Sequence, residues 1–144
     1  MYIEFLPDKK HAAKNADMSE DHIFFNDAGY VLTENDLIVD IDCLEKPVIE
    51  KMLSLFNVKT QTVWTERGVH LYFKRPETFR GANRVCALGF PIELKHIKNT
   101  KAITIKRNGV LRDIENKGVS PLEGEGIRGD GKAKWYVVHT YSGY

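Results

Sequence analysis

Residues 37–42 limit the fold of this chain more than any other segment, because an apolar run there contains two carboxylates. The run, Leu-Ile-Val-Asp-Ile-Asp, is typical of a buried β-strand, in which Asp40 and Asp42 would point to the same face. Two like charges on an apolar strand repel each other, and a bound cation is the usual compensation. Oxygen ligands alone favour Mg²⁺ or Mn²⁺ over Zn²⁺. In the simpler alternative, one carboxylate caps the following helix and the other is solvated.

A helix is predicted directly after this strand, over residues 44–57. Pro47 suits the first turn of a helix, apolar residues recur at helical spacing, and Asn57 is a typical terminating residue. A helix in this position packs back onto the sheet. The face that carries the two carboxylates would then stay free for a ligand.

A histidine lies in the next strand-like region, residues 63–73, which reads as two short strands joined by a charged turn. The turn closes on Gly68, which allows a close backbone approach, and Arg67 beside it is a natural partner for a phosphate. His70 follows in the second strand, where a lone histidine is more often a core residue than a ligand. Tyr72 is either a core residue or a surface on which a base stacks.

A third acidic residue lies in residues 90–96, which we expect to form another strand. Glu93 alternates with apolar neighbours and shares its face with Lys95. The two side chains form either part of a site or an ordinary surface ion pair, which would contribute little stability.

The order of these segments resembles the archaeo-eukaryotic primase superfamily, and more narrowly the bifunctional primase-polymerase domain of phages and plasmids. The resemblance covers residues 36–106. It rests on the two acids in an apolar strand, on the segment Thr-x-Arg-Gly-x-His-Leu-Tyr-Phe, and on a later strand with an acidic and then a basic residue. It implies an α+β fold with a mixed or antiparallel central sheet, flanking helices and a catalytic core like that of RNA-recognition motifs (RRM-like).

The resemblance also implies roles for individual residues. The three acids would be the catalytic residues and would hold one or two Mg²⁺ or Mn²⁺ ions. His70 would contact the phosphates of the incoming nucleotide, together with Arg67 and Lys95. The catalytic and metal-binding set is therefore Asp40, Asp42 and Glu93.

The activity that this resemblance implies is template-directed nucleotidyl transfer, as in a DNA primase or polymerase of phage or plasmid replication. The partners would be a single-stranded DNA template, nucleoside triphosphates and a helicase on a separate chain. One alternative is a catalytically inactive primase-like domain that binds nucleic acid, nucleotide or a protein. A second alternative is a metal-dependent nuclease that uses the same acids.

The flanking segments are predicted from local signals. Residues 1–6 read as a strand, residues 7–21 as a weak helix or loop, and residues 22–25 and 30–32 as strands around a turn. Asn-Gly between alternating segments predicts a hairpin over residues 103–112 with a type I′ turn. In the family, strands after the third acid complete the catalytic sheet, and this hairpin fits that position.

The chain of 144 residues is expected to contain one catalytic domain, residues 1–117. Residues 118–134 are rich in Gly, Glu, Pro and Lys and are predicted to be a flexible linker. Residues 135–144 are a strand-like tail of uncertain origin. The tail is similar to the first strand of bacterial transcription elongation factors of the NusG family, as a fusion or a truncation would produce.

Charge and composition narrow the classes of protein further. The formal net charge of +1 argues against a broadly basic coat for nucleic acid, although local basic patches remain compatible with it. The two cysteines have neither the CxxC nor the His/Cys spacing of a zinc site. Residues 1–144 contain no apolar run long enough for a membrane span and begin without the apolar core of a signal peptide. We therefore expect a soluble protein in the cytoplasm, of the host cell if the protein is viral.

Overall fold

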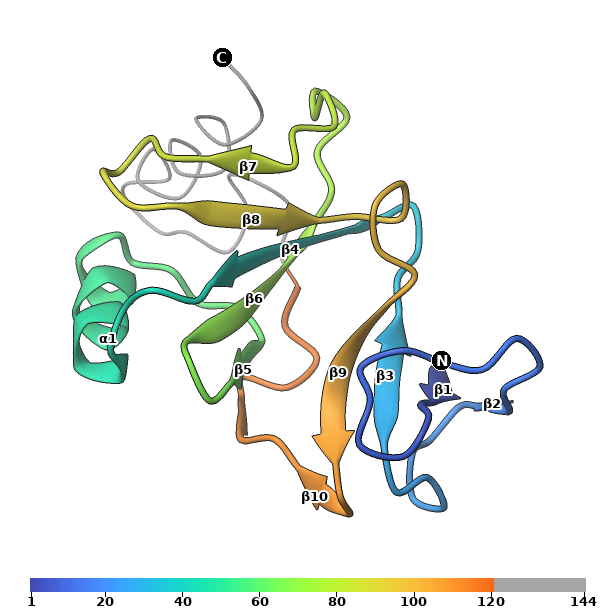
Figure 1. Ribbon diagram of the computed structural model, residues 1–144. Helices are drawn as coiled ribbons and strands as arrows, with labels where there is room; N and C mark the ends of the chain where they lie inside the picture. The colour runs from blue at the N-terminus through green and yellow to red at the C-terminus, as the bar shows by residue number, and fades with distance from the viewer. Residues whose placement is uncertain (121–144) are drawn as a thin grey trace.

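Two antiparallel sheets form the described part of the protein (Figure 1). The computed structural model describes residues 1–120, so nearly all of the predicted linker and the whole of the predicted tail lie outside it. The first sheet has the strand order β10-β9-β3-β1-β2. Its strands are β1 (Tyr2–Glu4), β2 (Met18–Ser19), β3 (Ala28–Val31), β9 (Ala102–Arg107) and β10 (Val110–Leu111).

The second sheet has the order β11-β5-β6-β4-β8-β7 and contains the acidic strand at its centre. The strand predicted over residues 37–42 is confirmed as β4, and every strand pairing in the described residues is antiparallel. The strands are β4 (Asp36–Ile41), β5 (Thr62–Trp64), β6 (Val69–Lys74), β7 (Arg84–Val85), β8 (Ile92–Lys95) and β11 (Ile114–Glu115). The expected single central sheet is therefore two sheets, and the alternative of mixed pairing is wrong for the described residues.

One helix, α1 (Lys46–Leu55), is present within residues 1–120, so the expectation of several flanking helices finds no support there. Pro47 lies in its first turn, as predicted, and Asn57 ends it in the left-handed conformation with φ of 53°. Ile49 of α1 is fully buried in a core cluster with Val39 and Leu71. The helix therefore covers the face of the sheet opposite Asp40, as predicted. Across residues 1–120, no helix combines the length and apolar character needed to cross a membrane.

The predicted strand at residues 22–25 is wrong. The carboxylate of Asp21 accepts a hydrogen bond from the backbone N–H of Ile23, and the N–H of Phe25 donates to the carbonyl of His22. These local bonds form a turn and take the donors that a strand would offer to a neighbour. The strand begins at Ala28 instead, inside the segment predicted as a turn.

The predicted hairpin is confirmed, but its assignment to the sheet of Asp40 is wrong. Asn108 and Gly109 both have positive φ, of 50° and 78°, as a type I′ turn requires. However, β9 pairs with β3 of the first sheet. The outer edges of the second sheet are already occupied by the two-residue strands β7 and β11. The hairpin therefore builds a second wall facing the acidic strand.

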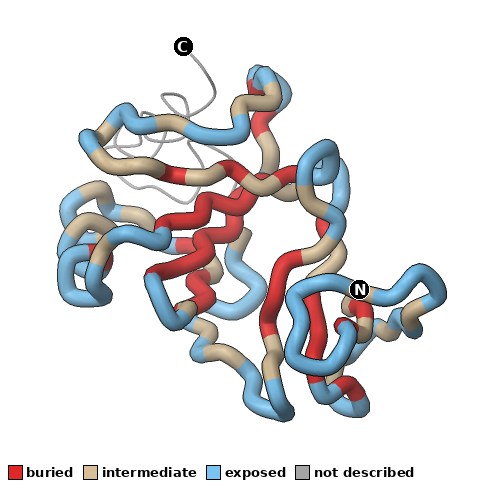
Figure 2. The backbone as a smooth tube through the Cα atoms, in the orientation of Figure 1, coloured by how far each residue is buried: buried red, intermediate tan, exposed pale blue. Residues whose placement is uncertain are grey.

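The two sheets meet through a small apolar cluster on the Asp40 side of β4. Ile38 of β4 and Tyr72 of β6 pack with Ile103 of β9. Tyr72 is also 5.7 Å from Tyr30, measured between ring centroids, so it is a core residue. Figure 2 shows buried backbone along β4 and β6 and again along β3 and β9. The face that was expected to be open is thus half covered, and what remains is a cavity between the sheets.

Gly68 holds the turn between β5 and β6 against the end of β4. A Cβ atom at this position would lie 1.7 Å from the carbonyl oxygen of Ile41. The predicted close approach is real, and the neighbour is the backbone of the acidic strand. We expect Gly68→Ala to reduce the free energy of unfolding by about 3 kcal/mol, because the backbone must move to make room.

Gly81→Ala is the matched control, since nothing lies within 4 Å of a Cβ there. Its positive φ of 82° should cost only about 1 kcal/mol. Urea unfolding of the two variants measures the difference, and equal losses would contradict a steric role for Gly68.

Candidate functional site

The antiparallel register brings three of the predicted side chains side by side. Asp40 of β4 pairs directly with His70 of β6 on one side and with Glu93 of β8 on the other. Directly paired residues have their Cβ atoms roughly 5 Å apart on the same face. The face opposite is apolar and covered by α1, which fixes the register because a slip of one residue would exchange the faces.

Asp42 comes just after the last residue of β4 and is exposed, whereas Asp40 is buried. Burial, first, and then the neighbouring Asp42 carboxyl together raise the pKa of Asp40 to about 7. One oxygen of Asp40, Oδ1, has no hydrogen-bond partner in the described residues. Lys95 offsets only part of the cost of ionising this buried carboxyl, because the pKa of Asp40 stays raised.

His70 is buried and electrically neutral at physiological pH. Burial lowers its pKa to about 3, and the positive charge of Arg112 acts in the same direction. Its Nε2 atom is 3.5 Å from Oδ1 of Asp40, too long for a good hydrogen bond. The contact is not an ion pair at pH 7, because the imidazole carries no charge. Its Nδ1 atom also lacks a partner within residues 1–120.

Glu93 lies in the same row of side chains across β6, β4 and β8, but its carboxylate forms an ion pair with a lysine. Its Oε2 atom is 2.9 Å from the ammonium of Lys95, and both side chains are partly exposed. In residues 1–120 there is no group of three or more His, Cys, Asp or Glu side chains already arranged to hold a metal. Of the three predicted acids, Glu93 is the one that forms an ion pair with a lysine or arginine in the described residues.

All six predicted site residues line one cavity of about 360 Å³ between the two sheets, which we call the Asp40 cavity. One wall is the polar face of β4, β6 and β8 with the turn before Gly68. The other wall comes from β9 and from the segment that follows β10. The predicted residues in it are Asp40, Asp42, Arg67, His70, Glu93 and Lys95.

Two cationic residues of the cavity, Lys10 and Arg112, were not predicted. Arg112 lies where the chain crosses from the first sheet to the second, and its side chain is only 8% exposed. Its guanidinium donates to Oε2 of Glu66 at 3.1 Å and to the backbone carbonyl of Thr104 at 3.4 Å. It therefore links the two walls. No local pattern marks either residue, since both reach the cavity only through the pairing of the first sheet.

Comparison of the chain with protein-family models, with curated proteins and with solved structures finds no match.

The charge of Asp40 should make stability depend on pH when no metal is present. The pKa of Asp40 is about 7 in the folded protein, against 3.8 for an unperturbed aspartate, which stands for the unfolded chain. Between about pH 4 and pH 7 the folded state therefore keeps a proton that the unfolded chain releases. The contribution of Asp40 to stability is therefore complete below about pH 4 and is lost as the pH rises to about 7. Asp40→Asn removes this loss.

Asp40→Asn changes the free energy of unfolding by an amount that depends on pH. We expect this change to be more favourable at pH 8 than at pH 5 by about 1–3 kcal/mol. Urea unfolding in buffer with a chelator measures both values. Glu77→Gln, which neutralises an exposed carboxylate, is the control and should show no such difference. If Asp40→Asn has the same effect at both pH values, Asp40 is not a buried acid with a raised pKa.

Proposed function

We propose that this domain catalyses metal-dependent, template-directed nucleotidyl transfer from nucleoside triphosphates, as DNA primases and polymerases do. The observation that carries the proposal is the Asp40 cavity itself. It combines two adjacent carboxylates with cationic side chains in one space of about 360 Å³. Carboxylates suit a divalent metal and cations suit phosphates, so a metal-bound triphosphate matches both parts.

The two carboxylates fit a hard divalent cation. Asp40 has a buried oxygen without a partner, and Asp42 raises its pKa, so a cation shared by the two would offset the repulsion. The donors are oxygens, which favours Mg²⁺ or Mn²⁺. Glu93 would be a third ligand, because its Oε2 atom pairs with Lys95 and a carboxylate has a second oxygen that can bind a metal.

The other cavity residues position the triphosphate in this proposal. Arg67 is exposed at the rim, and Lys95 lies beside the carboxylates, so both offer charge to the phosphate oxygens. His70 is neutral, and a ring N–H of it would donate a hydrogen bond to a phosphate oxygen. A divalent metal held by Asp40 and Asp42 would acidify the attacking 3′-hydroxyl and neutralise phosphate charge. In the overall reaction the 3′-hydroxyl loses its proton to water, its oxygen bonds to the α-phosphorus, and the bond from the α-phosphorus to the bridging oxygen breaks to release pyrophosphate.

The strand order gives further support to an RRM-like catalytic core. The sequence of elements is β4, α1, β5, β6 and then β8, with the spatial order β5-β6-β4-β8. A strand-helix-strand-strand-helix-strand unit with all neighbours antiparallel has this order. The second helix of such a unit is replaced here by residues 75–91, which contain β7 and are otherwise irregular.

Incorporation of labelled nucleoside triphosphates on single-stranded DNA, with Mn²⁺ or Mg²⁺, tests the proposal. We expect the double variant Asp40→Asn/Asp42→Asn to lose at least about a hundredfold in rate, because the charge that holds the metal is gone. The control Glu50→Gln/Glu77→Gln removes two exposed carboxylates and should keep full activity.

Two outcomes would overturn the proposal. Absence of product from the unmodified chain, with nucleotide or DNA still bound, identifies a non-catalytic primase-like domain. Metal-dependent shortening of the DNA without any need for triphosphate identifies a nuclease.

Metal binding is tested separately by thermal unfolding. A ligand that binds only the folded state at a concentration of 100 times its Kd adds about 2.7 kcal/mol of stability. We expect Mn²⁺ to raise the Tm by several degrees, a chelator to reverse the rise, and Asp40→Asn/Asp42→Asn to abolish it. An equal rise in the double variant would place the metal elsewhere.

A further inference from the structure

Within residues 1–120, a second cavity next to the Asp40 cavity is lined by basic and apolar residues and by no acidic one. It has a volume of about 400 Å³ and lies between the N-terminal loop and the start of β9. The two cavities share Lys10 and Ala102. We call this space the basic cavity. Its basic residues are Lys10, His11, Lys14 and Lys101, and the rest of its lining is apolar.

The two acids of the N-terminal loop, Asp8 and Asp17, do not line this cavity in the described structure. Asp8 accepts a hydrogen bond from the guanidinium of Arg107 at 3.0 Å and one from the side chain of Asn108 at 3.4 Å. Asp17 lines a different cavity, together with Asp27. The cavity is therefore lined by basic residues although the net charge of the chain is only +1. Within residues 1–120, none of the three lysines of the basic cavity forms an ion pair with a carboxylate.

Backbone hydrogen bonds hold the loop in this shape. The N–H of Leu6 donates to the carbonyl of His11 at 3.0 Å, and the N–H of Ala16 donates to the carbonyl of Ala13 at 3.2 Å. At the end of the loop, the N–H of Glu4 donates to the carbonyl of Asp17 at 2.9 Å. The basic groups are therefore presented by an ordered backbone, which reduces the entropy lost when they bind a ligand.

We infer that the basic cavity binds phosphates in the backbone of single-stranded nucleic acid beside the Asp40 cavity. This inference rests on the proposed function, which requires a strand to lie next to the triphosphate. Lysines without an ion pair in the described residues suit phosphate oxygens, and Lys14 and Lys101 line this cavity without an acidic neighbour in its lining. Lys10 belongs to both cavities, so a strand held in one continues to the other.

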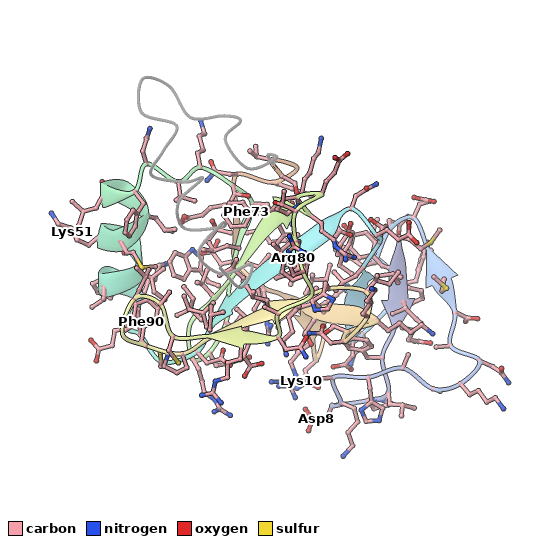
Figure 3. All side chains as sticks on the ribbon, turned by 90° about the horizontal axis from the view of Figure 1, so that it is seen from above. Asp8, Lys10, Lys51, Phe73, Arg80 and Phe90 are labelled. Atoms are coloured by element: carbon pink, nitrogen blue, oxygen red, sulfur yellow. The ribbon has the colours of Figure 1, made fainter. Side chains whose placement is uncertain are left out.

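Fluorescence anisotropy with a single-stranded DNA oligonucleotide that has a 5′-hydroxyl tests the inference, without metal or triphosphate. We expect Lys14→Gln/Lys101→Gln to bind about tenfold more weakly, with the slope of log K against log[salt] smaller by about 1 to 1.5. The control Lys51→Gln/Lys59→Gln removes the same charge from exposed positions. Figure 3 shows Lys51 far from Lys10 on the molecule. We expect the control to bind the oligonucleotide with nearly unchanged affinity.

Equal weakening in the two double variants would overturn the inference, because binding would then depend on total charge alone. Binding that requires a 5′-phosphate, or that millimolar inorganic phosphate abolishes, would assign the cavity to a terminal or free phosphate and overturn the backbone assignment. Asp40→Asn/Asp42→Asn should still bind the oligonucleotide. Loss of nucleotide incorporation and loss of oligonucleotide binding at the basic cavity are therefore distinguishable results.

Discussion

The antiparallel pairing of β4 with both β6 and β8 is the constraint on which the site depends. The register places Asp40 between His70 and Glu93, three residues that are far apart in the chain. The apolar residues on the other face of β4 pack against α1, so burial of that face fixes the polar row. Gly68 adds to this by letting the turn of β5 and β6 approach the end of β4.

This arrangement stabilises the fold on one face of β4 and strains it on the other. The raised pKa of Asp40 means that ionisation of this side chain opposes folding, by an amount on the order of a few kcal/mol. A purely structural strand would replace Asp40 with an apolar or neutral residue at no loss. Retention of two adjacent acids next to cationic side chains is expected where a cation and an anion bind together.

Local sequence signals predicted the elements that depend on near neighbours. The helix after β4, the turn at Gly68 and the Asn-Gly hairpin all follow from residues within a few positions of each other. The errors came from contacts that are distant in sequence. The hairpin joined the first sheet, because the edges of the second are occupied by β7 and β11. The turn at Asp21, which replaced a predicted strand, depends on a side-chain bond that hydrophobic pattern does not reveal.

For the site as well, local patterns predicted the residues, and contacts distant in sequence were missed. Strand alternation set the faces of the four predicted residues that lie in strands, namely Asp40, His70, Glu93 and Lys95. Asp42 and Arg67 line the same cavity from the end of β4 and from the turn before β6. The ion pair of Glu93 with Lys95 was one of two open interpretations, and both residues also line the cavity. Arg112 and Lys10 could not be predicted, since the first sheet brings them to the cavity only after its own pairing is known.

A crystal structure with Mn²⁺ and an unreactive nucleoside triphosphate analogue would show whether Asp40 and Asp42 hold the metal. We expect an anomalous scattering peak bound by the carboxylates of Asp40 and Asp42, with the triphosphate against Arg67 and Lys95. A peak at another position, or a triphosphate outside the Asp40 cavity, would rule out this metal and nucleotide site.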